Sequence, residues 1–563
     1  MTDVIVVGGG PVGLLLACEL KLAGADPLVL EAATGFVPER SMGLRSLNAR
    51  TVQSLALRGL AQAAAEEQRA MLDELAGRRD SAEGADVVAL LVELLGKGLV
   101  RGHFSGLPLL ADGGADYLML KQHRLEAVLA ERAEGLGVRV QRGCAVVDVA
   151  QEPDAVVATL TDGRVVRGSY LVGCDGGRSV VRKRTGFAFD GTEATMTGRT
   201  AVAELADPDA IASSLRGPGG LVNLSLVPGE IATLEFDGGP EERDTPMTAG
   251  ELQESLRRVT GIDVVVSLLE TGIRYGDNTR HASTYRMGRV LLAGDAAHVH
   301  SPIGGQGLNL GLQDAVNLGW KLALVARGLA PESLLDTYTG ERHPAAARVL
   351  RNTRAQVALM RPGPQVDALR EVLSEALELP QARDHFGGMM DGTDIAYAPG
   401  ADARVGRFAL TALEVVEAVR AAGDEAGAGA GWAAAVPAPG DPRGGPAVLT
   451  LGDALRDGRG VLVDLAGAAP TEDEPDRGEP GRPVDGELGG GGMGGGHVDG
   501  GGGLGAFVAG HRDRVRLVRA AAPVPGDGRA LLVRPDGYVA WAGGHDDHDG
   551  LGEAITRWFG PAM

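Results

Sequence analysis

One stretch near the start of the chain restricts its fold more than any other. Over residues 3–31 an apolar run, a glycine-rich turn, a helical stretch and a second apolar run ending in an acid follow one another. This order predicts two parallel strands joined by a helix, with glycines where the turn is tight, where a ligand approaches the backbone and where the helix packs. The acid favours a ribose without a 2′-phosphate, so we expect FAD or NAD rather than NADP. The turn and the acid consist of Gly8, Gly10, Pro11, Val12, Gly13 and Glu31.

A second glycine-rich stretch lies at residues 285–321. Its apolar run predicts a buried strand that ends on an acid, and a glycine-rich loop then leads into a helix. Glycines leave backbone N–H groups open to a planar or anionic ligand, and the acid can accept hydrogen bonds from sugar hydroxyls. A plain strand, turn and helix with a capping aspartate is the alternative. The residues concerned are Gly294, Asp295, Pro302, Gly305, Gly307, Leu308 and Asn309.

Composition excludes several classes of protein. A chain of 563 residues exceeds one core, so two or three domains are expected. The net charge of −21 argues against nucleic-acid binding, and no apolar run is long enough for a membrane span. Three cysteines without a pairing or ligand pattern argue against disulfides and metal. We expect a soluble, cytoplasmic protein that binds no metal, nucleic acid or membrane.

Polar side chains between the two glycine-rich stretches indicate a cofactor site less specifically than the glycines do. Arg40, Arg45 and Arg50 follow the first fingerprint and could meet a cofactor phosphate, although each one alone also fits a solvated surface residue. Gln122 stands where a strand turns into a helix, and either reaches a cofactor or only begins the helix. Residues 61–99 predict surface helices, with a substrate lid as the alternative.

A third motif follows a strand that ends near residue 173. Cys174, Asp175 and Gly176 again combine an acid with glycine, and Arg178 comes next. In this order the three motifs resemble those of the class A FAD-dependent monooxygenases, the para-hydroxybenzoate hydroxylase type. The resemblance covers the whole chain and is closest to the branch of aromatic polyketide hydroxylases and rifampicin monooxygenase.

The resemblance implies an α/β fold with three domains. A Rossmann-like (GR2-type) FAD-binding domain is expected at residues 1–185 and 271–395, with a mostly β substrate domain inserted at 186–270. A thioredoxin-like domain is expected at 396–563, with a disordered glycine-rich loop at 486–505. Aromatic residues are sparse in the inserted domain, so no stacking residue can be chosen. The chain has no CxxC pair, which excludes thiol redox chemistry.

Two further clusters invite a functional interpretation. Glu341, Arg342 and His343 could form a catalytic cluster, but a turn between helices, ended by Pro344, is the preferred interpretation. His497 and Asp499 lie within the glycine-rich loop, and we do not interpret them as metal ligands.

The resemblance also implies an activity. Bound FAD, reduced by NADPH or NADH, would react with O2 and hydroxylate a polycyclic aromatic substrate of the polyketide or antibiotic type through a flavin C4a-hydroperoxide. Baeyer–Villiger insertion or oxidative rearrangement is the alternative, followed by a flavin dehydrogenase and a non-catalytic flavin-binding protein. The substrate, the position oxidised and the choice between monomer and homodimer stay open.

Site residues follow from the matched motifs. The loop from Pro302 to Gly307 would lie beside the isoalloxazine ring and Leu308-Asn309 at its pyrimidine edge, while Asp175 and Arg178 would serve FAD and nicotinamide. Gly43 stands near the position where the family has an arginine, so Arg45 is the favoured cofactor contact and, with Pro302, a catalytic candidate. The predicted cofactor set is Gly8, Gly10, Pro11, Val12, Gly13, Glu31, Arg40, Arg45, Gln122, Asp175, Arg178, Gly294, Asp295, Pro302, Gly305, Gly307, Leu308 and Asn309.

Overall fold

The computed structural model divides the chain into two compact units. The first runs to residue 398 and includes Arg456–Gly458, and the second holds the other described residues from 400 to the end. Described residues are 2–37, 41–77, 117–211, 215–224, 229–243, 245–398, 400, 402–417, 448–466, 501–524 and 529–563. The expectations for Arg40, for residues 78–99 and for residues 486–500 lie outside them.

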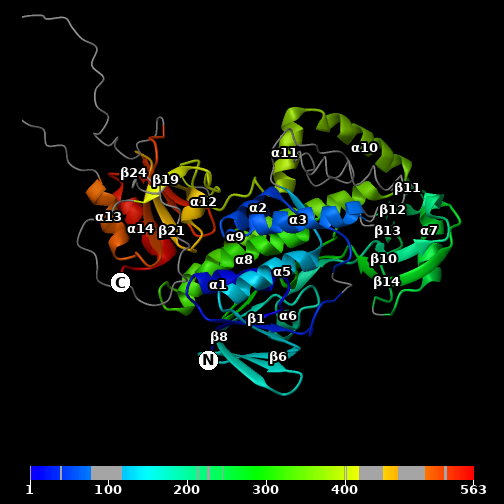
Figure 1. The fold of residues 1–563 in the computed structure, drawn as a ribbon, viewed down its shortest axis with the longest axis horizontal. Helices are drawn as coiled ribbons and strands as arrows, with labels where there is room; N and C mark the ends of the chain where they lie inside the picture. The colour runs from blue at the N-terminus through cyan, green and yellow to red at the C-terminus, as the bar shows by residue number, and fades with distance from the viewer. Residues whose placement is uncertain are drawn as a thin grey trace, which may run out of the picture. The chain divides into compact units, whose positions relative to one another are not determined.

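A largely parallel sheet forms the centre of the first unit (Figure 1). Its main strand order is β16-β17-β8-β1-β2-β5, and β6 and β7 extend it as a hairpin from β8. Strands β1 and β2 are buried over nearly their whole length, as expected for parallel strands covered on both faces. The strands are β1 (Thr2–Val7), β2 (Pro27–Glu31), β5 (Arg139–Arg142), β6 (Val146–Gln151), β7 (Val156–Leu160), β8 (Val165–Gly173), β16 (Arg286–Met287) and β17 (Val290–Leu292).

Parallel pairing decides where the three motifs meet. Strands β2, β1, β8 and β17 are parallel neighbours, so their carboxyl ends lie on one edge of the sheet. The first glycine turn, the Asp175 motif and the Asp295 motif each follow one of these strand ends. The α/β prediction is confirmed, and motifs more than 100 residues apart in the chain come together at this edge.

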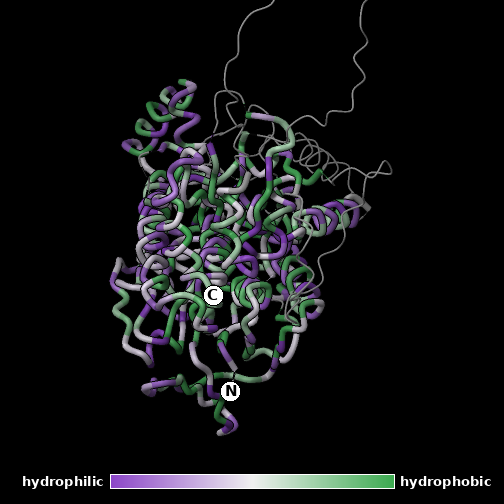
Figure 2. Tube along the Cα trace, turned by 90° about the vertical axis from the view of Figure 1, so that its left-hand side faces the viewer, coloured by the Kyte–Doolittle hydropathy of each residue, from purple (hydrophilic) through white to green (hydrophobic). Residues whose placement is uncertain are grey.

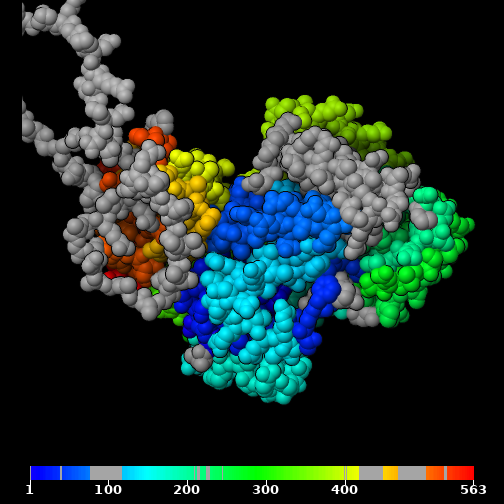
Figure 3. Space-filling model, in the orientation of Figure 1, coloured from blue at the N-terminus to red at the C-terminus, as the bar shows by residue number. Residues whose placement is uncertain are grey.

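Helices cover the central sheet. Helices α1 and α8 cross closely at Gly319 of α8, where an added Cβ would lie only 2.3 Å from the Cβ of Glu19 on α1. Glu19 accepts a two-pronged ion pair from Arg58, at 2.6 and 2.7 Å, and both side chains are buried. Helices α3 and α5 lie side by side at the surface (Figure 3), joined by ion pairs from Arg124 of α5. The helices are α1 (Pro11–Leu22), α2 (Ala49–Ala56), α3 (Ala61–Gly77), α5 (Gln122–Gly135), α6 (Val180–Thr185), α8 (Gln306–Ala326), α9 (Ser333–Met360), α10 (Pro364–Leu377) and α11 (Pro380–Asp391).

The predicted turn between helices at residues 341–344 is wrong. Helix α9 runs unbroken through Pro344. Proline removes one helical hydrogen bond, but the buried contacts of Glu341 and Arg342, just before it, keep this part of the chain helical. Glu341 accepts from Lys321 at 2.7 Å, and Arg342 donates to Asp314 at 2.7 Å. Burial and pairing, which local sequence does not reveal, override the helix-breaking tendency.

A second, antiparallel sheet is inserted after α6. Its order is β11-β12-β13-β10-β14, and helix α7 packs on one face over an apolar core that includes Ile231, Leu252 and Leu256. A three-stranded sheet, β18-β15-β9, leads back to the central sheet. The elements are β9 (Phe189–Thr192), β10 (Thr197–Leu205), β11 (Leu215–Gly217), β12 (Gly220–Leu224), β13 (Glu230–Glu235), α7 (Ala249–Thr260), β14 (Val266–Gly276), β15 (Thr279–Ala282) and β18 (His298–Val299).

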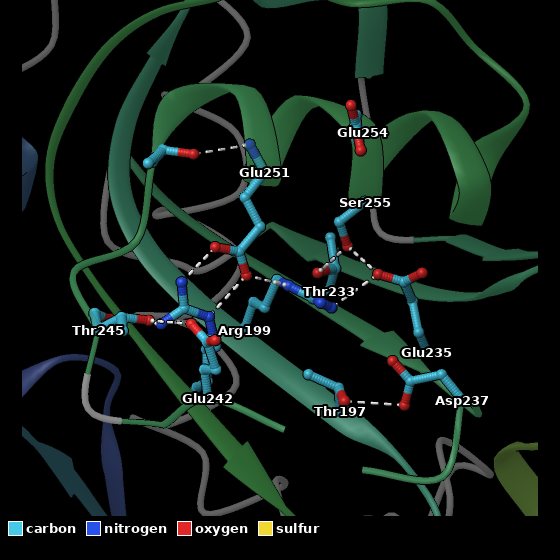
Figure 4. Close-up of polar contacts among 12 residues, drawn as sticks. Thr197, Arg199, Thr233, Glu235, Asp237, Glu242, Thr245, Glu251, Glu254 and Ser255 are labelled. Atoms are coloured by element: carbon cyan, nitrogen blue, oxygen red, sulfur yellow. Dashed lines mark hydrogen bonds and ion pairs between the residues drawn. The ribbon is translucent and has the colours of Figure 1, made fainter. Parts of the chain in front are cut away.

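A buried ion network fastens α7 to the sheet (Figure 4). Arg199 of β10 pairs with Glu235 of β13 at 2.7 Å and with Glu251 of α7 at 2.9 Å. Glu235 also accepts from Ser255 of α7 at 2.5 Å and from Arg258 at 2.6 Å. Because side chains alternate along a strand, the neighbours of Arg199 and Glu235 point to the opposite face.

The second unit contains a six-stranded sheet in the order β20-β19-β22-β21-β23-β24. Only β21 and β22 among its described neighbours run parallel. Helix α14 buries Leu551, Ile555, Trp558 and Phe559 on one face. The elements are β19 (Glu414–Glu417), β20 (Val448–Thr450), α12 (Leu451–Ala454), β21 (Gly460–Asp464), α13 (Gly501–Ala509), β22 (Val515–Ala520), β23 (Arg529–Val533), β24 (Val539–Gly544) and α14 (His548–Phe559).

The last five residues of the predicted glycine-rich loop are not a loop. Residues 501–505 form the first part of α13. Glycine disfavours helix, but Leu504 and Val508 of the same segment are buried. Tertiary packing therefore outweighs local propensity here.

Hydrophobic and hydrophilic residues alternate in short stretches along the described trace (Figure 2). Within that trace, no helix has the combination of length and apolar character that crossing a membrane would need.

Candidate functional site

Within the part of the chain that the structure describes, Gly10 is the one glycine of the turn between β1 and α1 that leaves room for a ligand. Gly8 has a positive φ of 108°, and a Cβ there would lie 2.4 Å from the carbonyl oxygen of Cys174. A Cβ on Gly13 would lie 2.0 Å from the carbonyl oxygen of Gly8, so both glycines serve internal packing. Among the described residues, the one atom within 4 Å of a Cβ on Gly10 would be an oxygen of Glu126, at 4.0 Å. The backbone at Gly10 is therefore open to an approaching group, which fits a dinucleotide phosphate.

The neighbouring residues at the start of α1 have separate tasks. Pro11 is the first helical residue, where its missing N–H costs nothing. The side chain of Val12 packs against Gly294 and Gly311, so it joins α1 to the second glycine-rich stretch. No described side chain caps α1, and its first N–H groups are left for a ligand.

Glu31 fixes the turn from the end of β2. Its carboxylate accepts from the N–H of Gly9 at 2.6 Å and from that of Ala33 at 2.9 Å, and the residue is buried. The predicted ribose acceptor thus lies beside the open glycine, already oriented by the backbone.

Arg45 and Gln122 come together beside Gly10. Strand β3 (Arg45–Leu47) pairs with β4 (Leu118–Leu120), which ends just before Gln122. Arg45 donates to the Gln122 side chain at 3.1 Å, and Gln122 donates to Glu126 at 2.8 Å. Glu126, which is the nearest neighbour of a Cβ on Gly10, was missed by sequence reasoning, although it follows Gln122 by one helical turn.

The electrostatics place Arg45 near the second acid as well. Burial lowers the pKa of the Arg45 guanidinium, and the charges of Asp295, Glu230 and Glu126 act in the opposite direction. Among these acids Asp295 has the largest effect, so the exposed Asp295 carboxylate lies within electrostatic range of Arg45. Two predicted residues 250 positions apart in the chain thereby lie near each other.

Asp175 has a local structural task. Its carboxylate accepts from the Ser179 hydroxyl at 2.5 Å and from the N–H groups of Val180 and Val181 at 2.7 and 3.1 Å, at the start of α6. Most of its hydrogen-bonding capacity is therefore used within the chain. Arg178 is exposed on the same turn.

The loop before α8 is built from left-handed glycines. Gly304 and Gly305 have φ values of 81° and 63°, conformations that side chains rarely adopt. Gly305 is the N-cap of α8, and no described side chain caps that helix. The N–H groups of Gln306, Gly307 and Leu308 therefore form an uncapped positive helix end beside the exposed Pro302.

Asn309 contributes indirectly. Its side chain accepts from the N–H of Asn48 at 2.8 Å and donates to the carbonyl groups of Ser46 and Gly305 at 2.7 and 2.9 Å. The amide therefore ties β3 and the glycine loop to α8, and the place of Leu308-Asn309 at the pyrimidine edge of the flavin stays a prediction.

A buried polar network supports the Asp295 turn from below. Asp314 of α8 accepts from the N–H of Gly294 at 3.1 Å, contacts His298 at 2.7 Å and pairs with Arg342 at 2.7 Å. Burial alone would raise the pKa of Asp314, but Arg342 and His298 lower it below its ordinary value. Sequence reasoning missed this network, because it considered only the apolar face of this helix, and the partners of Asp314 come from other segments of the chain.

One face of the inserted sheet is turned toward the glycine loop. Tyr275, opposite in direction to Arg274, lies on the face away from α7, and its ring covers Gly198, where a Cβ would lie 2.1 Å from the ring. Ile303 of the loop packs in one cluster with Leu234 and Tyr275 of this face. We call this face the platform; its half-buried or buried residues are Thr200, Leu221, Ala232, Leu234, Phe236, Ile273 and Tyr275.

Phe236 and Tyr275 are the aromatic residues of the platform, and sequence reasoning singled out neither of them. Burial raises the pKa of the Tyr275 phenol, while a hydrogen bond with Thr200 and the charge of Arg45 lower it. Tyr275 therefore stands near the same cation as the Asp295 turn. Among the described residues, no group of three or more metal-binding side chains occurs.

Comparison with known proteins agrees with this geometry. The family described as FAD binding domain matches residues 1–353, and the one described as aromatic-ring hydroxylase, C-terminal, matches residues 495–562. A 12-dehydrotetracycline 5-monooxygenase/anhydrotetracycline 6-monooxygenase of Streptomyces rimosus is 35% identical, over 99% of each chain. The rifampicin monooxygenase of Streptomyces venezuelae is 34% identical, over 100% of this chain and 99% of its own.

Two further similarities bear on the chemistry. A dialkyldecalin synthase of Streptomyces rugosporus is 32% identical over the full length of both chains. The solved structure of the anhydrotetracycline hydroxylase OxyS from Streptomyces rimosus superimposes with a TM-score of 0.76 at 34% identity, covering 100% of both chains. With the open Gly10 turn, the uncapped α8 and the matched family, the chain belongs to the FAD-dependent aromatic-ring hydroxylases and is a flavin-dependent monooxygenase.

Proposed function

We propose that this monooxygenase hydroxylates a polycyclic aromatic compound of the polyketide or antibiotic type, using NADPH or NADH and O2. The observation that carries the proposal is the platform, a broad, mostly apolar surface packed through Ile303 against the glycine loop. A flat apolar substrate would gain from burial on such a surface. The tetracycline and rifampicin relatives support this class of substrate.

The cofactor would be held by three groups of residues. The open Gly10 turn, with the first N–H groups of α1, would take the pyrophosphate, and Glu31 the adenosine ribose. Asp295 would accept from the ribityl chain, and the uncapped end of α8 would stabilise negative charge on the ring system. Bound FAD supplies the redox chemistry, in which the reduced flavin activates O2 for transfer to an electron-rich ring.

The chain's own residues position and enclose the reaction. Leu234 and Ile303 exclude water between the platform and the glycine loop, and the Tyr275 phenol can hydrogen-bond a substrate oxygen. The Arg45 cation stands near Tyr275 and Asp295, where it would favour an anionic phenol or cofactor. Arg178, exposed just before α6, would meet FAD and the nicotinamide substrate, and Asp175 would hold this turn in place through the start of α6.

For the second unit we propose a thioredoxin-like architecture. A mixed sheet with one described parallel pair and flanking helices α13 and α14 supports this. Cys18, Cys144 and Cys174 all lie in the first unit, so the second has no thiol chemistry of its own. We propose support or homodimer formation as its role, and a reducing cytoplasm as the location.

A second candidate rests on one relative. The dialkyldecalin synthase is similar to this chain over its full length, but it is named for a synthase reaction and not for oxygen transfer. A reaction that forms rings without incorporating oxygen is therefore the competing function. Baeyer–Villiger insertion at the same site would differ from hydroxylation only in the connectivity of the product.

The deciding experiment incubates the purified holoprotein with NADPH, isotope-labelled O2 and a panel that includes anhydrotetracycline and rifampicin. We expect a product that carries one labelled oxygen atom, with NADPH oxidation stimulated by its substrate. Product connectivity then separates hydroxylation from ring insertion. A product without label would support the synthase alternative, and NADPH oxidation without any labelled product would contradict the proposal.

A further inference from the structure

Glu230 is the one carboxylate of strand β13 that lies on the platform side. Strand alternation directs Glu235 toward α7 and Glu230 away from it. Glu230 is 3% exposed. A buried charge is costly unless it is paired, so its partners indicate what this residue does.

Two of its partners, Gly43 and Lys121, belong to the cofactor side of the unit. One oxygen of Glu230 accepts from the N–H of Gly43 at 3.0 Å, and the other from the Lys121 ammonium at 3.1 Å. These contacts cross 187 and 109 residues of sequence. Gly43 precedes β3, and Lys121 is the N-cap of α5, so Glu230 reaches both sides of the β3–β4 pair.

The turn that Glu230 holds carries Arg45. Gly43 has a φ of 74°, a left-handed conformation that suits glycine. Arg45 folds back over this turn and donates to the carbonyl of Met42 at 3.1 Å, and it also donates to the side chain of Gln122. The position of the guanidinium therefore depends on the conformation of residues 42–45.

We propose that Glu230 is a positioning residue that holds the turn at residues 42–45 so that Arg45 faces the cofactor. This inference rests on the proposed role of Arg45 at the FAD site. Glu230 acts in two ways: it fixes the Gly43 N–H, and it balances the cations of Lys121 and Arg45. The platform and the cofactor turn are thereby joined through one side chain.

A plain structural role would predict a different pattern. Any buried ion pair removed from the inserted sheet would then loosen the domain and weaken FAD binding to a similar extent. Glu235 offers a matched control, because it lies on the same strand and is also buried and ion-paired, but its partners lie on β10 and α7, on the opposite face of the sheet (Figure 4).

The experiment compares Glu230→Gln with Glu235→Gln in the full-length holoprotein. FAD release after dilution is followed through the recovery of flavin fluorescence. We expect release from Glu230→Gln to be about tenfold faster, equivalent to 1.4 kcal/mol at 25 °C if association is unchanged. We also expect an altered visible circular dichroism spectrum of the bound flavin. Glu235→Gln should stay within about twofold of the wild type in release and leave that spectrum unchanged.

A third variant tests whether Glu230 acts through Arg45. In an Arg45→Met background, Glu230→Gln should cause little further acceleration, because the group that it positions is absent. If Arg45→Met leaves FAD release unchanged, the proposed role of Arg45 fails. If Arg45→Met accelerates release but Glu230→Gln does not, or if both glutamate variants behave alike, the inference about Glu230 is wrong.

A variant that loses stability is examined by hydrogen–deuterium exchange in the holoprotein. The inference expects faster exchange confined to residues 41–47, with α7 unchanged. Faster exchange throughout the inserted sheet would overturn it.

Discussion

Gly10→Ala should separate cofactor binding from folding. The backbone at Gly10 has φ −76° and ψ −175°, which alanine adopts without strain, and the new methyl group would meet no atom of the described residues closer than 4.0 Å. We therefore expect the free energy of unfolding of the apoprotein to change by less than about 1 kcal/mol, since Gly→Ala at a compatible site gains about 0.4–1 kcal/mol and alanine is a weaker N-cap. The methyl group would occupy the space through which a phosphate approaches. FAD affinity should fall at least about tenfold, or 1.4 kcal/mol.

The assay measures both quantities on the same preparation. Urea denaturation of the apoprotein gives the free energy of unfolding, and titration with FAD gives the dissociation constant. Gly13→Ala is the control, because its methyl group would lie 2.0 Å from the Gly8 carbonyl oxygen and must displace backbone. That variant should lose stability and FAD affinity together. Wild-type FAD affinity in Gly10→Ala would refute the assignment of this turn as the phosphate site.

Three further predictions concern stability and the substrate. Arg58→Met removes the ion-pair partner of the buried Glu19 carboxylate and should lower the free energy of unfolding, measured by urea denaturation, by about 3–5 kcal/mol. The same change at the more exposed Lys21 should lower it by less than about 1 kcal/mol. Equal losses in the two variants would contradict the stabilising role of the buried pair. Tyr275→Phe should raise the KM for the aromatic substrate by a factor of about 2 to 10, since a neutral hydrogen bond contributes about 1 kcal/mol, and should leave FAD affinity unchanged. An unchanged KM would show that the Tyr275 phenol does not bind the substrate. Burial, together with the charges of neighbouring histidines, lowers the pKa of His281 from 6.5 to about 3. The unfolded chain therefore binds the proton at a higher pH than the folded protein, and stability is lost as the pH falls from about 6.5 toward 3. His281→Gln should flatten the pH dependence of the melting temperature in that range, and an unchanged slope would show that His281 is not responsible for it.

Local sequence was sufficient for much of the cofactor site. A buried parallel strand needs a continuous apolar run, and a tight ligand turn needs glycines, so Gly8, Gly10 and Gly13 could be found from their spacing alone. The acids at strand ends followed in the same way, because parallel strands bring their carboxyl ends to one edge. Resemblance to the family then predicted the cofactor and the class of reaction, and the comparisons confirm both.

Errors arose where long-range packing competes with local propensity. Pro344 should end a helix, but α9 continues because Glu341 and Arg342 are held by buried partners on α8. Glycines near residue 501 should form a loop, but burial of Leu504 makes them helical. In both places the deciding energy comes from side chains distant in sequence.

The sequence by itself determined the order of strands and helices, the glycine turns and the kind of cofactor, because these depend on periodicity and on backbone freedom at single positions. The tertiary structure alone decided which polar side chains face the site. Asn309 and Asp175 turned out to be engaged within the chain, while Glu126, Tyr275 and Glu230 joined the surroundings of Arg45. Their role depends on which strand face they occupy and on partners up to 187 residues away, and no local pattern carries that information.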